Sequence, residues 1–189
     1  MPVARAGWMA TVILLVVGFA LVPASAQWSG HMSGQLHPVT RGRLVTLMGV
    51  EEAVLAMTND LRRRHGLPVF LKDESCQNAA RGHSADMFTR NYFSHTDPEG
   101  RAVKERLPDN HAIRLWGENL WTGRGYDPSK VQHLARMIMV GWMNSPGHRK
   151  NLLAPGYTHL GVGVISRNQE VKATQVFIGV AAADVRTFK

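Results

Sequence analysis

Two histidines and one glutamate are the residues of this chain whose types and placement could do chemistry. His95, Glu118 and His159 each lie in a polar segment next to, rather than within, a clearly periodic apolar stretch. Imidazole nitrogens and a carboxylate can bind a divalent metal or carry protons in general acid–base catalysis. A chain with 9 histidines and 14 acidic residues contains many such triples by chance. Whether these three residues form a site therefore depends on the helices and strands that position them.

Helical periodicity covers most of the first two thirds of the chain after residue 45. Asp73 is a candidate N-cap, and Asp127-Pro128 combines an N-cap with a proline at the first helical position. Gly66 and Pro68 end the first apolar stripe. These signals predict helices over residues 50–61, 73–87, 102–107 and 128–142, with a further helical turn from Ser145-Pro146.

The end of the chain changes to the two-residue period of strands. Residues 159–165 alternate between an apolar face and a face of small residues, and residues 175–182 form a second candidate strand. Asn168-Gln169 between them predicts an antiparallel hairpin. Short strands are expected at Phe70-Leu71 and at residues 114–116. Helices followed by a terminal hairpin indicate an α+β layered domain.

The N-terminus has the pattern of an export signal. Arg5 precedes an apolar run from Met9 to Val22, and Ala24-Ser25-Ala26 gives the small residues of a cleavage site. We expect a signal peptide at residues 1–26 with cleavage after Ala26, and a secreted or periplasmic protein. An uncleaved membrane anchor is the alternative. A flexible arm is expected at residues 27–45, where His31 and His37 offer possible metal ligands, and one domain at residues 46–185.

Charge and cysteine content narrow the classes of function. The formal net charge of +8 is spread over short groups of Lys and Arg, so no concentrated basic stripe predicts nucleic-acid binding. Weak attraction to an anionic envelope surface, or simple solubility, explains such a charge. Cys76 is the only cysteine, so no disulfide forms within the chain. It shares a helical stripe with Ala79, Ala80, His83 and Met87, which predicts a buried, unreactive thiol.

Four ordered motifs resemble the CAP superfamily (cysteine-rich secretory proteins, antigen 5 and pathogenesis-related proteins) in its compact bacterial form. They are Phe93-Ser94-His95, Gly117-Glu118-Asn119-Leu120, the run GWMNSPGHR at 141–149 and the run YTHLGVG at 157–163. The resemblance covers about residues 49–180. It implies a three-layer α–β–α sandwich with a central antiparallel sheet, and an open cleft in which two His and two Glu converge. The positions that match are His95, Glu118 and His159.

The fourth position of the resembled cluster departs from the family pattern. Met137 stands where the family carries its second glutamate, five residues before Trp142. A thioether is only a weak hydrogen-bond acceptor and no base. His133, one helical turn earlier, is a possible substitute. The incomplete set favours a binding protein over a catalyst.

Three functions remain open from the sequence. The first is a binding module whose cleft holds an extended ligand (a lipid, a glycan or a peptide) over His95, Glu118 and His159. The second is a metal-assisted hydrolase, in which His95 and His159 hold a weakly bound divalent ion such as zinc and Glu118 activates a water. The third is a structural or partner-binding envelope protein. His83 and His148 are expected to be structural residues.

Overall fold

The computed structural model describes residues 42–110 and 112–181, all of which belong to one compact unit, residues 40–189. The predicted signal peptide, arm residues 27–41 with His31 and His37, and residues 182–185 lie outside these described residues. Within them, no helix is both long and apolar enough to cross a membrane.

A five-stranded sheet forms the centre of the domain, with the strand order β1-β4-β5-β3. Its strands are β1 (Val45–Thr46), β2 (Leu71–Lys72), β3 (Ile113–Arg124), β4 (His159–Arg167) and β5 (Glu170–Val180). The ladders β1–β4, β4–β5 and β5–β3 are antiparallel, as expected. Among the strands of the described residues, only the short β2 deviates, because it pairs with β4 in parallel.

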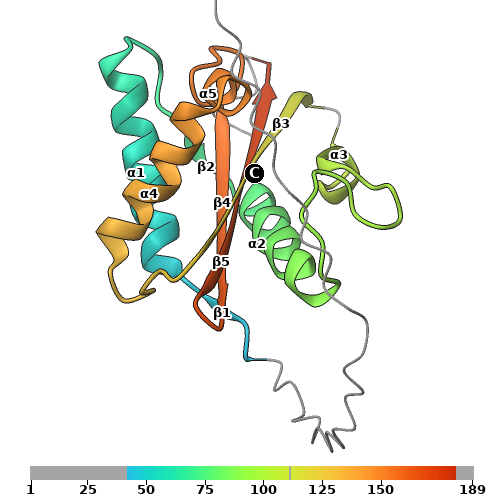
Figure 1. Cartoon of the computed structure of the whole chain (residues 1–189). Helices are drawn as coiled ribbons and strands as arrows, with labels where there is room; N and C mark the ends of the chain where they lie inside the picture. Colours follow the sequence, from blue (N-terminus) through green and yellow to red (C-terminus); the bar gives the residue numbers. More distant parts are fainter. Residues whose placement is uncertain (1–41, 111, 182–189) are drawn as a thin grey trace, which may run out of the picture. The chain divides into compact units, whose positions relative to one another are not determined.

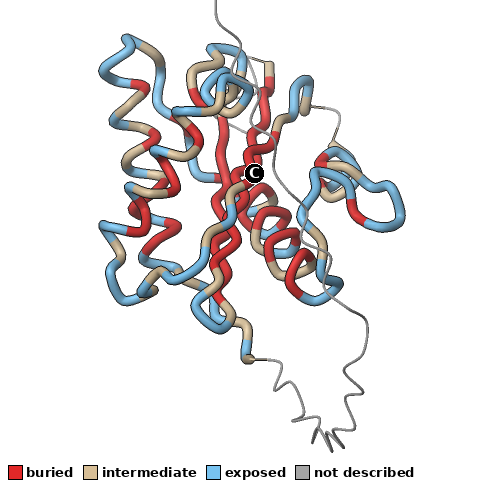
Figure 2. The backbone as a smooth tube through the Cα atoms, viewed as in Figure 1, coloured by how far each residue is buried: buried red, intermediate tan, exposed pale blue. Residues whose placement is uncertain are grey.

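Helices cover both faces of the sheet and complete the expected α–β–α sandwich (Figure 1). On one side lie α1 (Met48–Arg64) and α4 (Val131–Asn144), and α5 (Pro146–Leu152) follows at the end of α4, next to the sheet. On the other lie α2 (Glu74–Thr89) and the short α3 (Val103–Arg106). The helices α1, α2 and α4 each bury one face toward the sheet and expose the other (Figure 2). Trp142 of α4 is fully buried, as its position in the apolar stripe predicts.

The small-residue face of β4 lets α2 approach closely. A Cβ atom at Gly161 would lie 2.1 Å from the backbone of Cys76 and Gln77, and one at Gly163 would lie 2.2 Å from the backbone nitrogen of Arg81. The helix starts where predicted, since the Asp73 carboxylate accepts a 2.7 Å hydrogen bond from the Cys76 backbone nitrogen. Cys76 is fully buried, and its burial raises the pKa of the thiol.

Local sequence signals succeeded at the hairpin and failed at one helix start. Asn168 and Gln169 both have positive φ (50° and 63°), the backbone of a two-residue primed turn between β4 and β5. Asp127 does not cap α4: its carboxylate accepts a hydrogen bond from the Ser129 backbone nitrogen, and the helix begins only at Val131. The short strand expected at residues 114–116 is the beginning of the 12-residue β3, which includes Glu118.

Candidate functional site

A buried carboxylate on β3 is the centre of the site. Glu118 Oε1 lies 2.8 Å from His95 Nδ1, and the two side chains differ sharply in exposure, at 3% and 57%. His95 lies in the bend after α2, far from Glu118 in sequence. The sequence prediction that these two residues converge therefore matches the geometry. A carboxylate on Nδ1 orients an imidazole and leaves its other nitrogen available to a ligand.

Arg106 of α3 completes the environment of the carboxylate. Its guanidinium lies 2.5 Å from Glu118 Oε2, and it also donates to the His95 carbonyl oxygen at 3.3 Å. Each oxygen of Glu118 thus has a partner, as a buried charge requires. Sequence reasoning missed Arg106, although an arginine shortly after the His95 segment was the natural cation to search for.

His83 of α2 lies beneath the same carboxylate. Its Nε2 is 2.9 Å from the Ser94 carbonyl oxygen and 3.9 Å from Glu118 Oε1, and its side chain is 1% exposed. Burial lowers the pKa of His83, against the attraction of Glu118. The expected buried histidine is therefore present, and it holds the backbone next to His95.

His148, rather than His159, lies beside His95. The two rings have centroids 6.4 Å apart. Asn119 of β3 fixes α5 here by donating to the His148 carbonyl oxygen at 3.2 Å, and Asn151 of α5 donates to the Glu118 carbonyl oxygen at 3.1 Å. Burial, and then the charge of His95, lowers the pKa of His148. The sequence predicts only a structural role for His148, but its ring lies beside that of His95 and is part of the site.

His159 occupies a different part of the sheet. It pairs with Ile178 of β5, which pairs with Trp116 of β3, whereas Glu118 pairs with Val176, two residues away along β5. Because neighbouring strands are about 4.8 Å apart, β5 separates the two backbones by roughly 10 Å. The His159 Nδ1 lies 2.9 Å from Thr158 Oγ1. Burial lowers the pKa of His159, against the opposing effect of the Asp73 charge. We therefore assign His148, not His159, to the cluster around His95.

The position of the missing glutamate lies on the other side of β3. His133, Met137 and Gly141 are spaced by four residues along α4 and share one side of it. The His133 ring is 6.4 Å from that of Tyr126, and Gly141 packs against Trp121, which points to the face of β3 opposite Glu118. His133 is thus not a substitute partner for Glu118.

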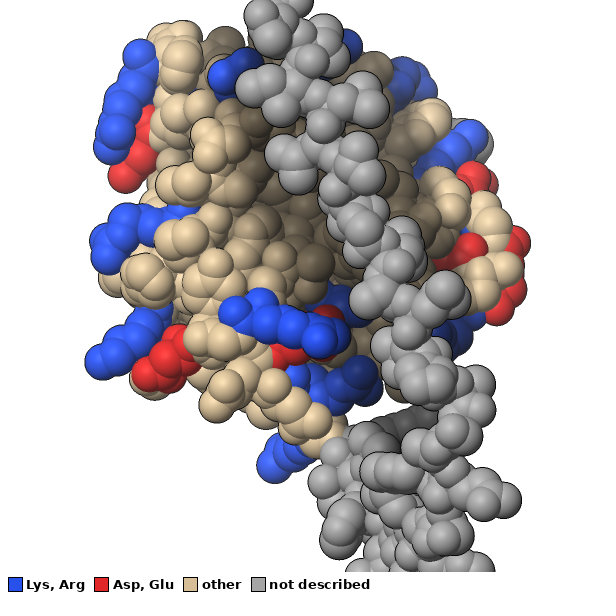
Figure 3. Space-filling view, in the orientation of Figure 1, with Lys and Arg blue, Asp and Glu red and all other residues tan. Residues whose placement is uncertain are grey.

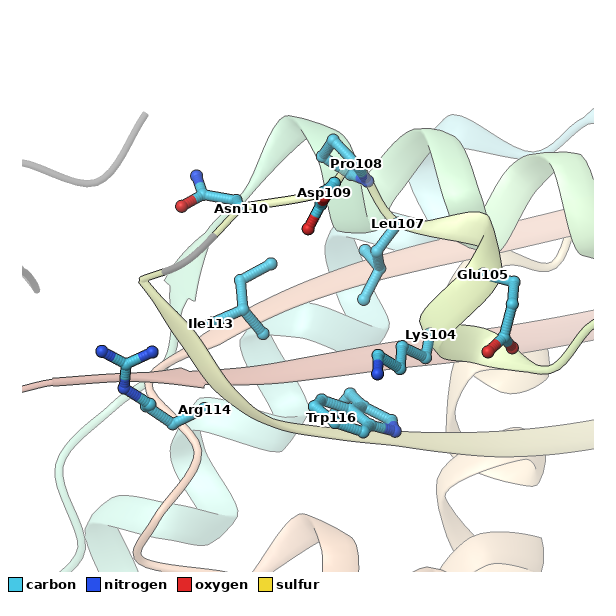
Figure 4. Close-up of a pocket in the computed structure, with 9 residues that line it drawn as sticks. All are labelled: Lys104, Glu105, Leu107, Pro108, Asp109, Asn110, Ile113, Arg114 and Trp116. Atoms are coloured by element: carbon cyan, nitrogen blue, oxygen red, sulfur yellow. The ribbon is translucent and has the colours of Figure 1, made fainter.

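Two hollows flank α3 next to this cluster. One, of about 570 Å³, lies between α2 and α3 and includes His83 and Arg106 in its wall. The other, of about 640 Å³, lies between α3 and β3 and is here called the α3–β3 groove. Its lining residues are Lys104, Glu105, Leu107, Pro108, Asp109, Asn110, Ile113, Arg114 and Trp116 (Figure 4). Basic side chains of the described residues lie in separate places over the face in Figure 3.

The family of the chain follows from comparison with known proteins. The model of the CAP family (cysteine-rich secretory protein family) matches residues 55–180, which include His95, Glu118 and His148. The chain belongs to the CAP family. The resemblance carried by the four motifs is thereby confirmed.

Bacterial relatives support the same assignment. The membrane protein YlbC of Bacillus subtilis is 41% identical over 115 residues, which are 60% of this chain and 31% of YlbC. YkwD of the same organism is 35% identical over 130 residues, 68% of this chain and 47% of YkwD. The chain thus spans a third to a half of the length of these relatives.

A solved structure agrees with the fold. The 1.5 Å crystal structure of an extracellular, SCP-domain-containing protein of Bacillus anthracis has a TM-score of 0.57 and 35% identity, over 70% of this chain and 41% of that protein. The chain therefore contains a CAP domain that is similar in sequence and fold to one in a bacterial extracellular protein.

Proposed function

We propose that this CAP-domain chain is an exported binding module that holds an extended envelope ligand across His95 and the hollows beside α3. The observation that carries this proposal is the fixed, exposed His95. Its Nδ1 is held by buried Glu118, and its ring remains 57% exposed at the surface. Such a side chain offers a preorganised polar contact at little cost in conformational entropy.

The surroundings of Glu118 favour binding over proton transfer by this carboxylate. A general base needs an oxygen that reaches the substrate or a water. Here one oxygen faces His95, the other faces Arg106, and the side chain is 3% exposed. Its contribution is therefore to orient His95 and to balance the charge of Arg106.

Substitution of His95 by alanine is expected to weaken binding to envelope material at least fivefold, roughly the loss of one hydrogen bond. The measurement is cosedimentation of the purified chain with insoluble cell-wall material and, separately, with membrane vesicles. His65→Ala is the matched control, because His65 is an exposed histidine at the end of α1, on the other side of the sheet. Equal retention of wild type, His95→Ala and His65→Ala would contradict the proposal.

A weak metal site is the second candidate, and the His95–His148 pair favours it. A carboxylate on Nδ1 of a metal-binding histidine is a common arrangement. The residues fit only in part: the described part of the chain contains no group of three or more His, Cys, Asp or Glu that could hold a metal. A bound ion would polarise a ligand or a water. The chain itself supplies two imidazoles, while Arg106 keeps the second oxygen of Glu118 engaged.

Zinc is accordingly expected to bind more weakly than about 1 μM, since tight sites use at least three protein ligands. His95→Ala and His148→Ala should abolish this binding, and His159→Ala should leave it unchanged. Isothermal titration calorimetry of an untagged protein at pH 7.5 measures it. Loss of binding in His95→Ala and His159→Ala, with unchanged binding in His148→Ala, would restore the residue pair expected from the sequence.

A further inference from the structure

The α3–β3 groove has a floor and a rim of different chemistry. Trp116, Leu107 and Ile113 form the apolar part, and Lys104 extends over the Trp116 ring with its ammonium 4.9 Å from the ring centroid (Figure 4). We propose that this groove binds a run of pyranose rings in a polysaccharide chain. This inference rests on the proposed function and names the class of its ligand.

An exposed tryptophan is the first observation that supports a sugar ligand. Trp116 is 41% exposed, although it is the largest apolar side chain on this part of β3. Its ring lies along the groove, not in the core (Figure 4). The negative face of an indole attracts weakly positive C–H groups, which a pyranose ring presents on one side. Lys104 lies over this ring, so a sugar would stack on the indole by displacing that long, flexible side chain.

The rim supplies the second observation. Lys104 and Arg114 carry positive charge, and Glu105 and Asp109 carry negative charge, so the charged side chains of the lining balance. Asn110 adds an amide. Closely placed carboxylates, amides and cations match the many neutral donors and acceptors of sugar hydroxyls. A volume of about 640 Å³ is within the usual range for small-ligand sites and accommodates a short oligosaccharide.

The neighbouring edge of β3 argues against a peptide that adds as a further strand. The carbonyl oxygens of Trp116, Glu118 and Leu120 accept hydrogen bonds from Tyr157, Asn151 and Trp142, respectively. These side chains occupy the acceptors that an added strand would need. An acyl chain fits poorly for another reason, since charged groups border the apolar floor along the groove.

The groove and the His95 cluster share the elements β3 and α3. Trp116 and Glu118 are two residues apart on β3 and therefore point to the same face. Across from them on α3, Lys104 contacts Trp116 and Arg106 contacts Glu118. A chain of sugar rings that stacks on Trp116 would thus extend toward the exposed His95.

The test is a titration of the purified chain with two soluble probes, tetra-N-acetylchitotetraose and cellotetraose, followed by the NMR signal of the Trp116 indole N–H. Binding of either probe should shift this signal saturably. Trp116→Ala should weaken that binding at least about tenfold, as for a central aromatic contact, and Trp116→Phe should retain most of it. Affinities of the variants are measured by calorimetry. The control is Leu115→Ala, an exposed apolar neighbour on the opposite face of β3, which should change the affinity less than twofold.

Three results would overturn the inference. They are the absence of a saturable shift with both probes, equal affinity in wild type and Trp116→Ala, and Trp116-dependent binding of phosphatidylglycerol–phosphatidylcholine vesicles in place of sugars. Circular dichroism of Trp116→Ala and Trp116→Phe verifies that both variants fold. If both probes fail while envelope cosedimentation still depends on His95, the groove assignment is wrong and the proposed function stands. If the dependence on His95 also fails, both are wrong.

Discussion

Substitution of Glu51 by alanine is expected to lower the free energy of unfolding by about 3–4 kcal/mol, because it removes the centre of a buried polar network. Glu51 is 3% exposed and accepts hydrogen bonds from Arg81 at 3.0 Å, Gln77 at 3.1 Å and the backbone nitrogen of Val164 at 3.1 Å. Gln77 also donates to the Val162 carbonyl oxygen.

This network lies at the stretch of β4 between its pairs with β2 and its pairs with β1, where no strand of the described residues borders its outer side. On one side of this stretch β2 pairs with His159 and Leu160, and on the other side β1 pairs with Ile165 and Ser166. Between these pairs, Gln77 binds both backbone groups of Val162, Glu51 accepts from the Val164 nitrogen, and the Leu47 backbone nitrogen donates to the Val164 carbonyl oxygen. Glu51→Ala would leave the Val164 N–H without its acceptor in a buried strand, in addition to breaking the ion pair with Arg81.

Urea unfolding followed by circular dichroism measures the effect. Glu52→Ala is the matched control: Glu52 is the next residue of the same helix but is exposed, so its loss should cost less than about 0.5 kcal/mol. Arg81→Ala should cost as much as Glu51→Ala or more, because it leaves the buried carboxylate without its cation. Equal stability of Glu51→Ala and Glu52→Ala would show that the network contributes nothing.

The second large effect is a loss of stability in mild acid. Burial lowers the pKa values of His83, His148 and His159 in the folded protein. As the pH falls through about 6.5, the unfolded chain takes up protons at these histidines while the folded chain does not. Proton uptake by the unfolded chain then favours unfolding. The free energy of unfolding continues to fall until the pH reaches the lowered pKa values of the folded protein. Each histidine contributes a slope of up to about 1.4 kcal/mol per pH unit.

The free energy of unfolding at several pH values between 7.5 and 5 tests this expectation. His83→Gln should reduce the pH slope, because it removes one buried titrating group while its amide can still donate to the Ser94 carbonyl oxygen. The exposed His65→Gln variant controls for the substitution itself. A wild-type stability that is constant over this range, or a slope that is the same in His83→Gln, would contradict the assignment.

Signals confined to short stretches of sequence determined most of the elements. The N-cap Asp73, the helical stripe through Cys76, the turn residues Asn168-Gln169 and the small residues Gly161 and Gly163 each act on neighbouring backbone, so their consequences are readable from local spacing. The four ordered motifs predicted the CAP family, and the family predicted the three-layer arrangement of helices and sheet. Asp127-Pro128 failed because an Asx turn satisfies the same carboxylate without starting a helix.

Only the tertiary structure decided which polar residues meet. Both His148 and His159 follow Glu118 by many residues, and the sequence does not state directly which strands are neighbours. The order β1-β4-β5-β3 inserts β5 between His159 and Glu118, whereas Asn119 and Asn151 hold α5, with His148, against β3. The partnership of Arg106 with Glu118 arises in the same way, because a buried carboxylate selects its cation by proximity in the folded domain, not by position along the chain.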